Sequence, residues 1–220
     1  MGFGIAIRVK GQYALFTRPE MKVERVSYDV PTPSAARGII EAIYWKPAIA
    51  WKIDKIHVLN PINFTNIRRN EISEKISTDT AKSIMRGNTD RQLYVDVLSS
   101  RQQRASMVLT NVDYIFEAHF SHDPANAESD DTPEKHYNIV LRRLRSGQYY
   151  HQPCLGTREF PAEVSLHEGP LPPSYHQGAQ DLGWMLYDMD FSDPKDIKPV
   201  FFKAVMINGT IDLQNIQKAV

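Results

Sequence analysis

Apolar and polar residues alternate along several short stretches of this chain, a pattern typical of strands with one buried face. In residues 112–121 every second side chain from Val112 to Phe120 is apolar or small, and Glu117 and His119 fall on the other face. Residues 4–9 and 51–59 show the same period, and Asn60-Pro61 ends the latter. In the last third we expect strands at residues 183–191 and 200–207, and an Asn208-Gly209 hairpin turn leading into 210–213.

Two stretches have a helical period instead. Residues 34–45 carry an apolar stripe, with Ser34 as the expected N-cap and Pro47 as the stop. Thr132-Pro133 opens a second helix that runs to Arg145 and ends before Gly147. Its expected inner stripe is Tyr137, Val140, Leu141 and Leu144.

A long polar insert separates the predicted strands at 51–59 and 112–121. Residues 64–72 and 101–110 are typical of the two arms of an extended hairpin, and residues 73–100 form the polar segment between them. Further on, residues 152–164 predict a strand interrupted by Gly156 and Pro161.

The predicted order is strand, helix, strand, hairpin insert, strand, helix, strand, which is the split βαβ or ferredoxin-like order. We therefore expect an α+β protein in which both helices cover one face of an antiparallel sheet. The expected domains are a ferredoxin-like domain at 1–165, with its insert at about 64–110, and a small β-rich extension at 166–220.

The composition narrows the possible partners. A net charge of zero conceals 17 basic against 10 acidic residues in 1–110, and 9 against 16 in 111–220. Polyanion binding is therefore expected on the first half. The single cysteine, Cys154, excludes an intramolecular disulfide and favours a cytosolic protein, and no apolar run is long enough for a membrane helix.

Candidate functional residues lie at two places in the sequence. Tyr44, Trp45 and Lys46 stand together at the end of the first predicted helix, where they suit stacking on bases and contact with phosphates. The other interpretation is that the two aromatic residues belong to the core. His119, on the polar side of its strand, is the best candidate for proton transfer, or else a surface histidine paired with a neighbouring side chain.

Other motifs are weak. His119 and His122 form an H-x-x-H pair, but side chains three apart on a strand point to opposite faces, which disfavours a metal site. There is no phosphate-binding G-x-x-x-x-G-K-S/T loop and no G-x-S-x-G nucleophile motif. We expect neither a metal nor a cofactor.

Several blocks together resemble one family: IYWKP, NVDYIFEAHF, QPCLGTREFP, DLGWMLYDMDF and FFKAVM. The chain resembles, over almost its whole length, the d variant of the CRISPR-associated Cas-five proteins of subtype I-C, in the RAMP superfamily. The resemblance implies an RRM/RAMP ferredoxin-like fold with a C-terminal β extension. It also implies a metal-independent endoribonuclease that cuts the repeat of the precursor CRISPR RNA and leaves 2′,3′-cyclic phosphate products.

The resemblance also assigns residues. It makes Tyr44 and His119 catalytic and expects a lysine directly before the histidine, where this chain has Ala118. Lys46 is the candidate substitute, because it is close to Tyr44 in sequence. The predicted RNA contacts are Trp45 and six arginines of the insert: Arg68, Arg69, Arg86, Arg91, Arg101 and Arg104.

The expected partners are the precursor repeat hairpin, the mature guide 5′ handle, and the backbone and large subunits of the surveillance complex. Duplex DNA is a further candidate partner. The Ala118 departure keeps a second function open, that of a non-catalytic subunit that only binds the 5′ handle.

Overall fold

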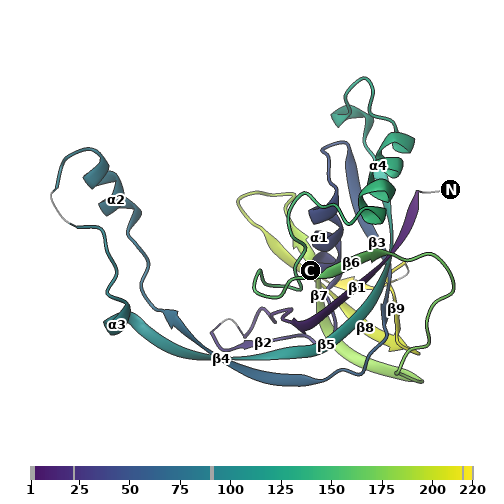
Figure 1. The fold of residues 1–220 in the computed structure, drawn as a ribbon, viewed down its shortest axis with the longest axis horizontal. Helices are drawn as coiled ribbons and strands as arrows, with labels where there is room; N and C mark the ends of the chain where they lie inside the picture. Colours follow the sequence, from purple (N-terminus) through teal and green to yellow (C-terminus); the bar gives the residue numbers. More distant parts are fainter. Residues whose placement is uncertain (1–2, 22, 90–91, 215, 220) are drawn as a thin grey trace. The chain divides into compact units, whose positions relative to one another are not determined.

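The computed structural model describes residues 3–21, 23–89, 92–214 and 216–219 (Figure 1). The chain divides into two compact units, one formed by Met1–Thr65 and Met107–Val220 and the other by Asn66–Ser106. The smaller unit lies inside the insert that the sequence predicts at about 64–110.

The larger unit contains a mostly antiparallel sheet in which β3, β5, β1 and β6 lie side by side in that order. β9 and then β8 continue the sheet beyond β3, and β7 and β10 pair with β8. The strands are β1 (Gly4–Ala14), β2 (Arg25–Val26), β3 (Ile49–Val58), β4 (Phe64–Ile72), β5 (Arg101–His122), β6 (Glu163–Leu166), β7 (Ala179–Asp190), β8 (Lys198–Ile207), β9 (Thr210–Asp212) and β10 (Lys218–Ala219).

Two helices pack on one face of this sheet, α1 (Pro33–Ile43) and α4 (Pro133–Arg145). The N-cap of α1 is Thr32 and not Ser34, because the Thr32 hydroxyl accepts a hydrogen bond from the backbone N–H of Ala35 at 3.2 Å. Thr32 precedes a proline that needs no amide partner, so the N-cap lies two residues earlier than predicted. Thr132 caps α4 in the same way, as the sequence indicates.

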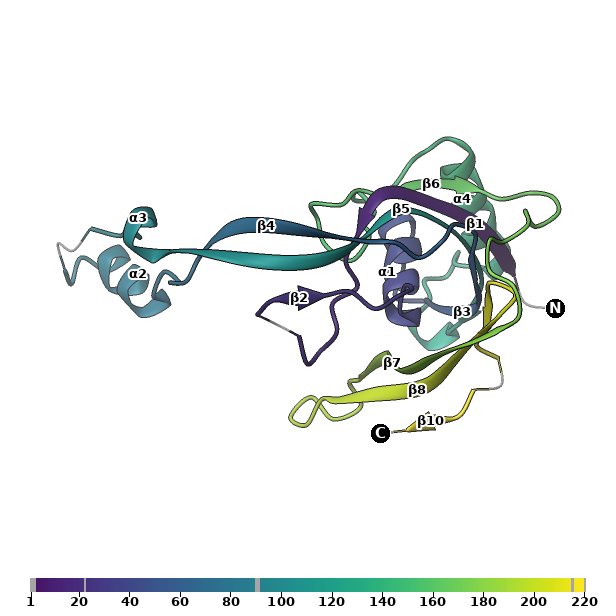
Figure 2. The same ribbon diagram turned by 90° about the horizontal axis from the view of Figure 1, so that it is seen from below.

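The core lies between these helices and the sheet. Figure 2 shows β1, β5, β3, β8 and β7 curving around α1. The alternation in residues 112–121 is confirmed: every second residue from Val112 to Phe120 belongs to the buried core. Ile115 and His57 are also buried, so the opposite face is not open along its whole length.

Residues 152–164 do not form the predicted strand. Only Glu163–Leu166 pairs with β1, and the preceding residues make a single bridge between Cys154 and Pro161. Gly156 has a φ of +87°, and a Cβ there would lie 2.0 Å from the backbone oxygen of Leu15. This glycine therefore marks a tight turn and not a strand interior.

The smaller unit contains most of β4, the start of β5, and the helices α2 (Thr78–Met85) and α3 (Val97–Ser100). No residue of α2 is buried. Several large apolar side chains of this unit are exposed, including Met85, Tyr94 and Leu98. In the part of the chain that the structure describes, no helix is long and apolar enough to cross a membrane.

The N-cap assignment can be tested by measuring how much the cap contributes to the free energy of unfolding. We expect Thr32→Ala to lower the free energy of unfolding by about 1 kcal/mol, as measured by chemical denaturation, because the Ala35 amide loses its acceptor. Ser34→Ala is the matched control and should cost clearly less. Equal losses in the two variants would contradict the assignment.

Candidate functional site

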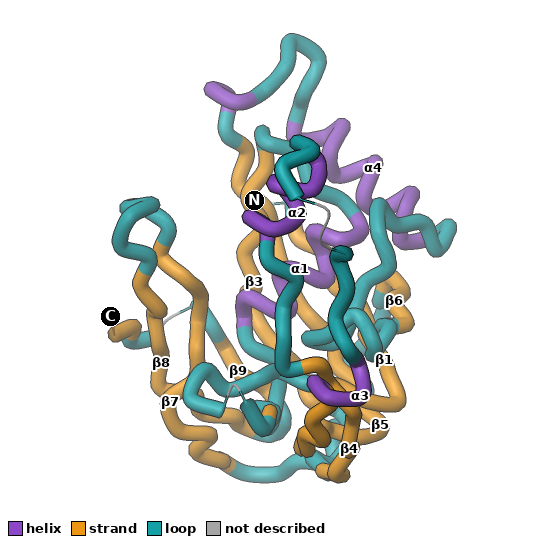
Figure 3. The backbone as a smooth tube through the Cα atoms, turned by 90° about the vertical axis from the view of Figure 1, so that its left-hand side faces the viewer, coloured by secondary structure: helices purple, strands orange, loops and turns teal. Residues whose placement is uncertain are grey.

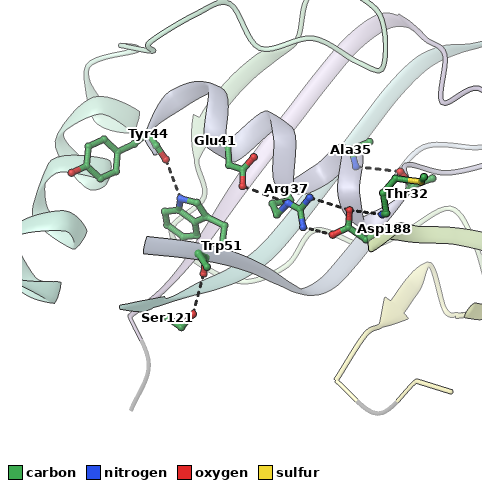
Figure 4. A network of polar contacts seen from close by, with 10 residues as sticks. Thr32, Ala35, Arg37, Glu41, Tyr44, Trp51, Ser121 and Asp188 are labelled. Carbon is green, nitrogen blue, oxygen red and sulfur yellow. Dashed lines mark hydrogen bonds and ion pairs between the residues drawn. The ribbon is translucent and has the colours of Figure 1, made fainter. Parts of the chain in front are cut away.

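Tyr44 is the first residue after α1 and lies in the core with only 3% of its surface exposed. Its backbone carbonyl accepts a hydrogen bond from the indole N–H of Trp51 at 3.0 Å (Figure 4). Its phenol oxygen lies 2.8 Å from Nδ1 of His136. The tyrosine is thus fixed at both its backbone and its hydroxyl.

His136 lies in the first turn of α4 and is fully buried. The Thr132 cap starts the helix so that position 136 faces inward, where its backbone N–H donates to the Thr132 carbonyl. The ring lies among aromatic neighbours, with centroid distances of 5.8 Å to His122 and 6.4 Å to Phe120. Its Nε2 is buried and has no hydrogen-bond partner among the described residues.

Cations lie near Tyr44 and His136. The Arg143 guanidinium lies 5.1 Å from the centre of the Tyr44 ring and donates to the Ile43 carbonyl at 2.6 Å. The Lys135 ammonium bonds Asp130 at 2.7 Å and Asp131 at 3.2 Å. These aspartates belong to the connection between β5 and α4, which is loop apart from the short helix η1 (Pro124–Asn126) (Figure 3).

Burial sets the protonation of the pair. It raises the pKa of Tyr44, Asp131 raises it further, and Arg143 and Lys135 act in the opposite direction. Burial lowers the pKa of His136, an effect that Asp131 opposes and that His122, Lys135 and Lys46 reinforce. At neutral pH the site therefore holds a protonated phenol beside a neutral imidazole, which can act as a base.

His119 lies on the other face of the sheet. Its neighbours in sequence, Ala118 and Phe120, belong to the core that contains Tyr44. The His119 side chain is 36% exposed, and its Nδ1 lies 2.8 Å from the Asp54 carboxylate. The structure therefore does not bring His119 and Tyr44 into one site, because adjacent residues of a strand face opposite ways.

The other predicted contact residues are dispersed. Trp45 is 52% exposed and Lys46 is exposed next to it. In the insert, Arg68, Arg86 and Arg101 are exposed, whereas Arg69 and Arg104 form ion pairs with Glu71. Arg91 lies outside the described residues.

No group of three metal-ligating side chains is present in the part of the chain that the structure describes. The H-x-x-H pair is split between the two faces, with His119 at Asp54 and His122 at His136.

Two residues near Tyr44 that the sequence pattern did not single out are Lys135 and His136. The helical period marks Tyr137 as the inward residue, but the structure turns His136 fully inward and leaves Tyr137 partly buried. A signal was present, because positions 135–136 are the one place in the sequence where a lysine directly precedes a histidine. The structure places this histidine against Tyr44, with Nδ1 2.8 Å from the Tyr44 hydroxyl oxygen.

Comparison with known proteins gives a consistent result. Residues 4–214 match the model of the family described as CRISPR-associated protein (Cas_Cas5). The chain is 49% identical over 214 residues to the CRISPR pre-crRNA endoribonuclease Cas5d of Mannheimia succiniciproducens, covering 95% of this chain and 94% of that protein. It is 40% identical over 200 residues to the protein of the same name from Thermus thermophilus, covering 90% and 79%.

Solved structures agree with the sequence match. One, described as a CRISPR-associated protein, has a TM-score of 0.69 at 29% identity and covers 96% of this chain and 92% of its own. A functionally uncharacterized protein of Streptococcus mutans has a TM-score of 0.67 at 28% identity, with the same coverage. By the family match and these identities, the chain belongs to the Cas5d family of CRISPR-associated proteins.

Proposed function

We propose that this protein is an endoribonuclease that cleaves precursor CRISPR RNA within its repeat. Two curated relatives that cover most of the chain carry that name. One observation supports the assignment of this activity to particular atoms: the 2.8 Å contact between the Tyr44 hydroxyl and Nδ1 of His136. A phenol and an imidazole in contact beside a lysine supply the groups that RNA transesterification needs.

The proposed reaction needs no metal. The ribose 2′-OH attacks the adjacent phosphorus, the 2′-O–P bond forms, and the P–O5′ bond breaks to give a 2′,3′-cyclic phosphate and a 5′-OH. The 2′-OH passes its proton to the Tyr44 oxygen while Tyr44 passes its own to His136, and the leaving 5′-oxygen takes a proton from water. The imidazolium of His136 then returns its proton to the hydroxide that remains, so that both the enzyme and the water are restored. The Lys135 ammonium stabilises the charge that develops on the phosphate.

This assignment moves the catalytic histidine from His119 to His136. It also fills the role of the expected lysine, which the sequence around Ala118 left vacant, so that departure no longer favours a non-catalytic subunit. Lys46 becomes an auxiliary cation whose charge acts on His136. Because Tyr44 and His136 are buried, RNA must displace side chains that cover them.

We further infer a ferredoxin-like arrangement for the four strands β3, β5, β1 and β6. Their antiparallel order, with α1 following β1 and α4 following β5, is the order of that fold. In this arrangement the C-terminal end of α1, which Tyr44 follows, and the first turn of α4, which contains His136, lie on the same side of the sheet.

The exposed Trp45 and the insert arginines are the proposed RNA contacts. Stacking on an exposed indole tolerates any base, and cations spaced along two hairpin arms suit a phosphate backbone. After cleavage the protein is proposed to keep the 5′ handle within the surveillance complex, together with the backbone and large subunits.

The catalytic assignment predicts a contrast between two histidines. Single-turnover cleavage of the repeat RNA from the source genome's own CRISPR array should fall at least about a hundredfold in Tyr44→Phe, His136→Ala and Lys135→Ala. His119→Ala is the matched control and should stay within about threefold of the parent. If His119→Ala abolishes cleavage and His136→Ala retains it, the active site lies on the other face of the sheet.

The proposed chemistry predicts the products and the metal requirement. Cleavage should continue unchanged in EDTA, and mass spectrometry of the upstream fragment should show a 2′,3′-cyclic phosphate. A single 2′-deoxy substitution at the scissile nucleotide should abolish cleavage, because the nucleophile is gone. Cleavage of the deoxy substrate, or a 3′-OH product, would contradict this mechanism.

The insert predicts salt-dependent binding. Replacing the exposed Arg68 and Arg101 by alanine should weaken RNA binding and reduce the log–log salt slope by roughly 0.7 to 0.9 for each phosphate that is no longer bound. Arg104→Ala is the control and should have a smaller effect, since Glu71 already engages that charge. A slope unchanged in the double variant would place the RNA path elsewhere.

A further inference from the structure

Asp131 is the one carboxylate that faces the buried side of the His136 ring among the described residues. Its side chain is only 7% exposed, although the loop that carries it is largely exposed, and its Oδ1 lies 3.9 Å from Nε2 of His136. That nitrogen has no hydrogen-bond partner in the described part of the chain. The carboxylate and the unpartnered ring nitrogen are thus turned toward each other inside the protein.

The carboxylate is ionised in this setting. Burial opposes its charge, but hydrogen bonds from the Lys135 ammonium and the backbone N–H of Glu128 outweigh burial and lower the pKa of Asp131. An ionised carboxylate only accepts hydrogen bonds, so it favours a proton on the ring nitrogen that faces it.

The choice of tautomer decides what Tyr44 can do. A neutral histidine carries its proton on either Nδ1 or Nε2. With the proton on Nε2, Nδ1 is free to accept the hydrogen bond and then the proton of the Tyr44 hydroxyl. With the proton on Nδ1, the ring donates to Tyr44 and cannot take its proton.

We propose that Asp131 is a positioning residue that holds His136 in the Nε2–H tautomer and stabilises the imidazolium formed when Tyr44 transfers its proton. The proposal rests on the proposed function and adds a third member to the site, so that Tyr44, His136 and Asp131 act in series. The proton moves from the Tyr44 oxygen to Nδ1, the proton on Nε2 stays in place, and the positive charge that results faces Asp131. Asp131 itself touches no substrate.

Asp130 provides a matched control within the same loop. Asp130 and Asp131 both bond the Lys135 ammonium, but Asp130 is 74% exposed and only Asp131 faces His136. Replacing Asp130 therefore removes a negative charge that acts on Lys135 alone, whereas replacing Asp131 removes a negative charge that acts on both Lys135 and His136. The other titratable and charged groups around the pair come from β5, from α4 and from the residues that follow α1: Tyr44, Lys46, His122, Lys135 and Arg143.

The direct test is NMR of the free protein with ¹⁵N-labelled histidine, which needs no RNA. In the parent protein the His136 nitrogens should report a proton on Nε2 at neutral pH. In Asp131→Asn that preference should disappear and the pKa of His136 should fall, because the charge that opposes burial is gone. Asp130→Asn should leave both unchanged. A parent ring protonated on Nδ1, or a tautomer unchanged in Asp131→Asn, would overturn the proposal.

The kinetic test uses the full chain and the same repeat RNA. Asp131→Asn should lower the single-turnover rate at least about tenfold with RNA affinity little changed, whereas Asp130→Asn should stay within about threefold. A rate that is unchanged or higher in Asp131→Asn would show that Asp131 merely covers His136, and would overturn the positioning role. The His136→Ala variant separates a failure of the positioning role of Asp131 from a failure of the proposed function. Full activity in His136→Ala would show that the proposed catalytic site itself is wrong.

Discussion

The hydrogen bond between Tyr44 and His136 joins the end of α1 to the start of α4, and the candidate chemistry depends on that junction. Several local features hold it in place. Thr32 and Thr132 fix where the two helices begin, Trp51 binds the Tyr44 carbonyl, and Arg143 connects α4 to the end of α1. Most of these side chains lie at or beside a helix end. The positions at which the helices begin and end therefore determine the geometry of the site.

Much of the fold followed from periodicity. The alternation in residues 112–121, the capped helix from Pro133 and the Asn208-Gly209 turn were all confirmed, because in each case one local rule decides the structure. Both turn residues have positive φ, as that type of hairpin requires. The failure at residues 152–162 has an equally local reason, since Gly156 makes a turn against Leu15 that only the tertiary structure reveals.

The candidate site could be predicted only in part. Tyr44 stood out because aromatic and basic residues cluster at a helix end, but its partner lies 92 positions later in the chain. A pattern of hydrophobicity counts a buried histidine as polar, and it therefore assigns the inward position of α4 to the neighbouring Tyr137. Only the packing of α4 on the sheet shows that His136 is inside, where Phe120 and His122 lie against it.

The two histidine–aspartate pairs of this site and of the opposite sheet face show why burial is the deciding quantity. His119 and Asp54 make the closer contact, at 2.8 Å, but the His119 side chain is 36% exposed and water can satisfy it. His136 is completely enclosed, so its ring nitrogens depend on Tyr44 and on the field of Asp131. In a medium of low dielectric constant a carboxylate at 3.9 Å still influences which nitrogen holds the proton. The pair with the longer contact is therefore the one whose protonation depends on the protein and not on the solvent.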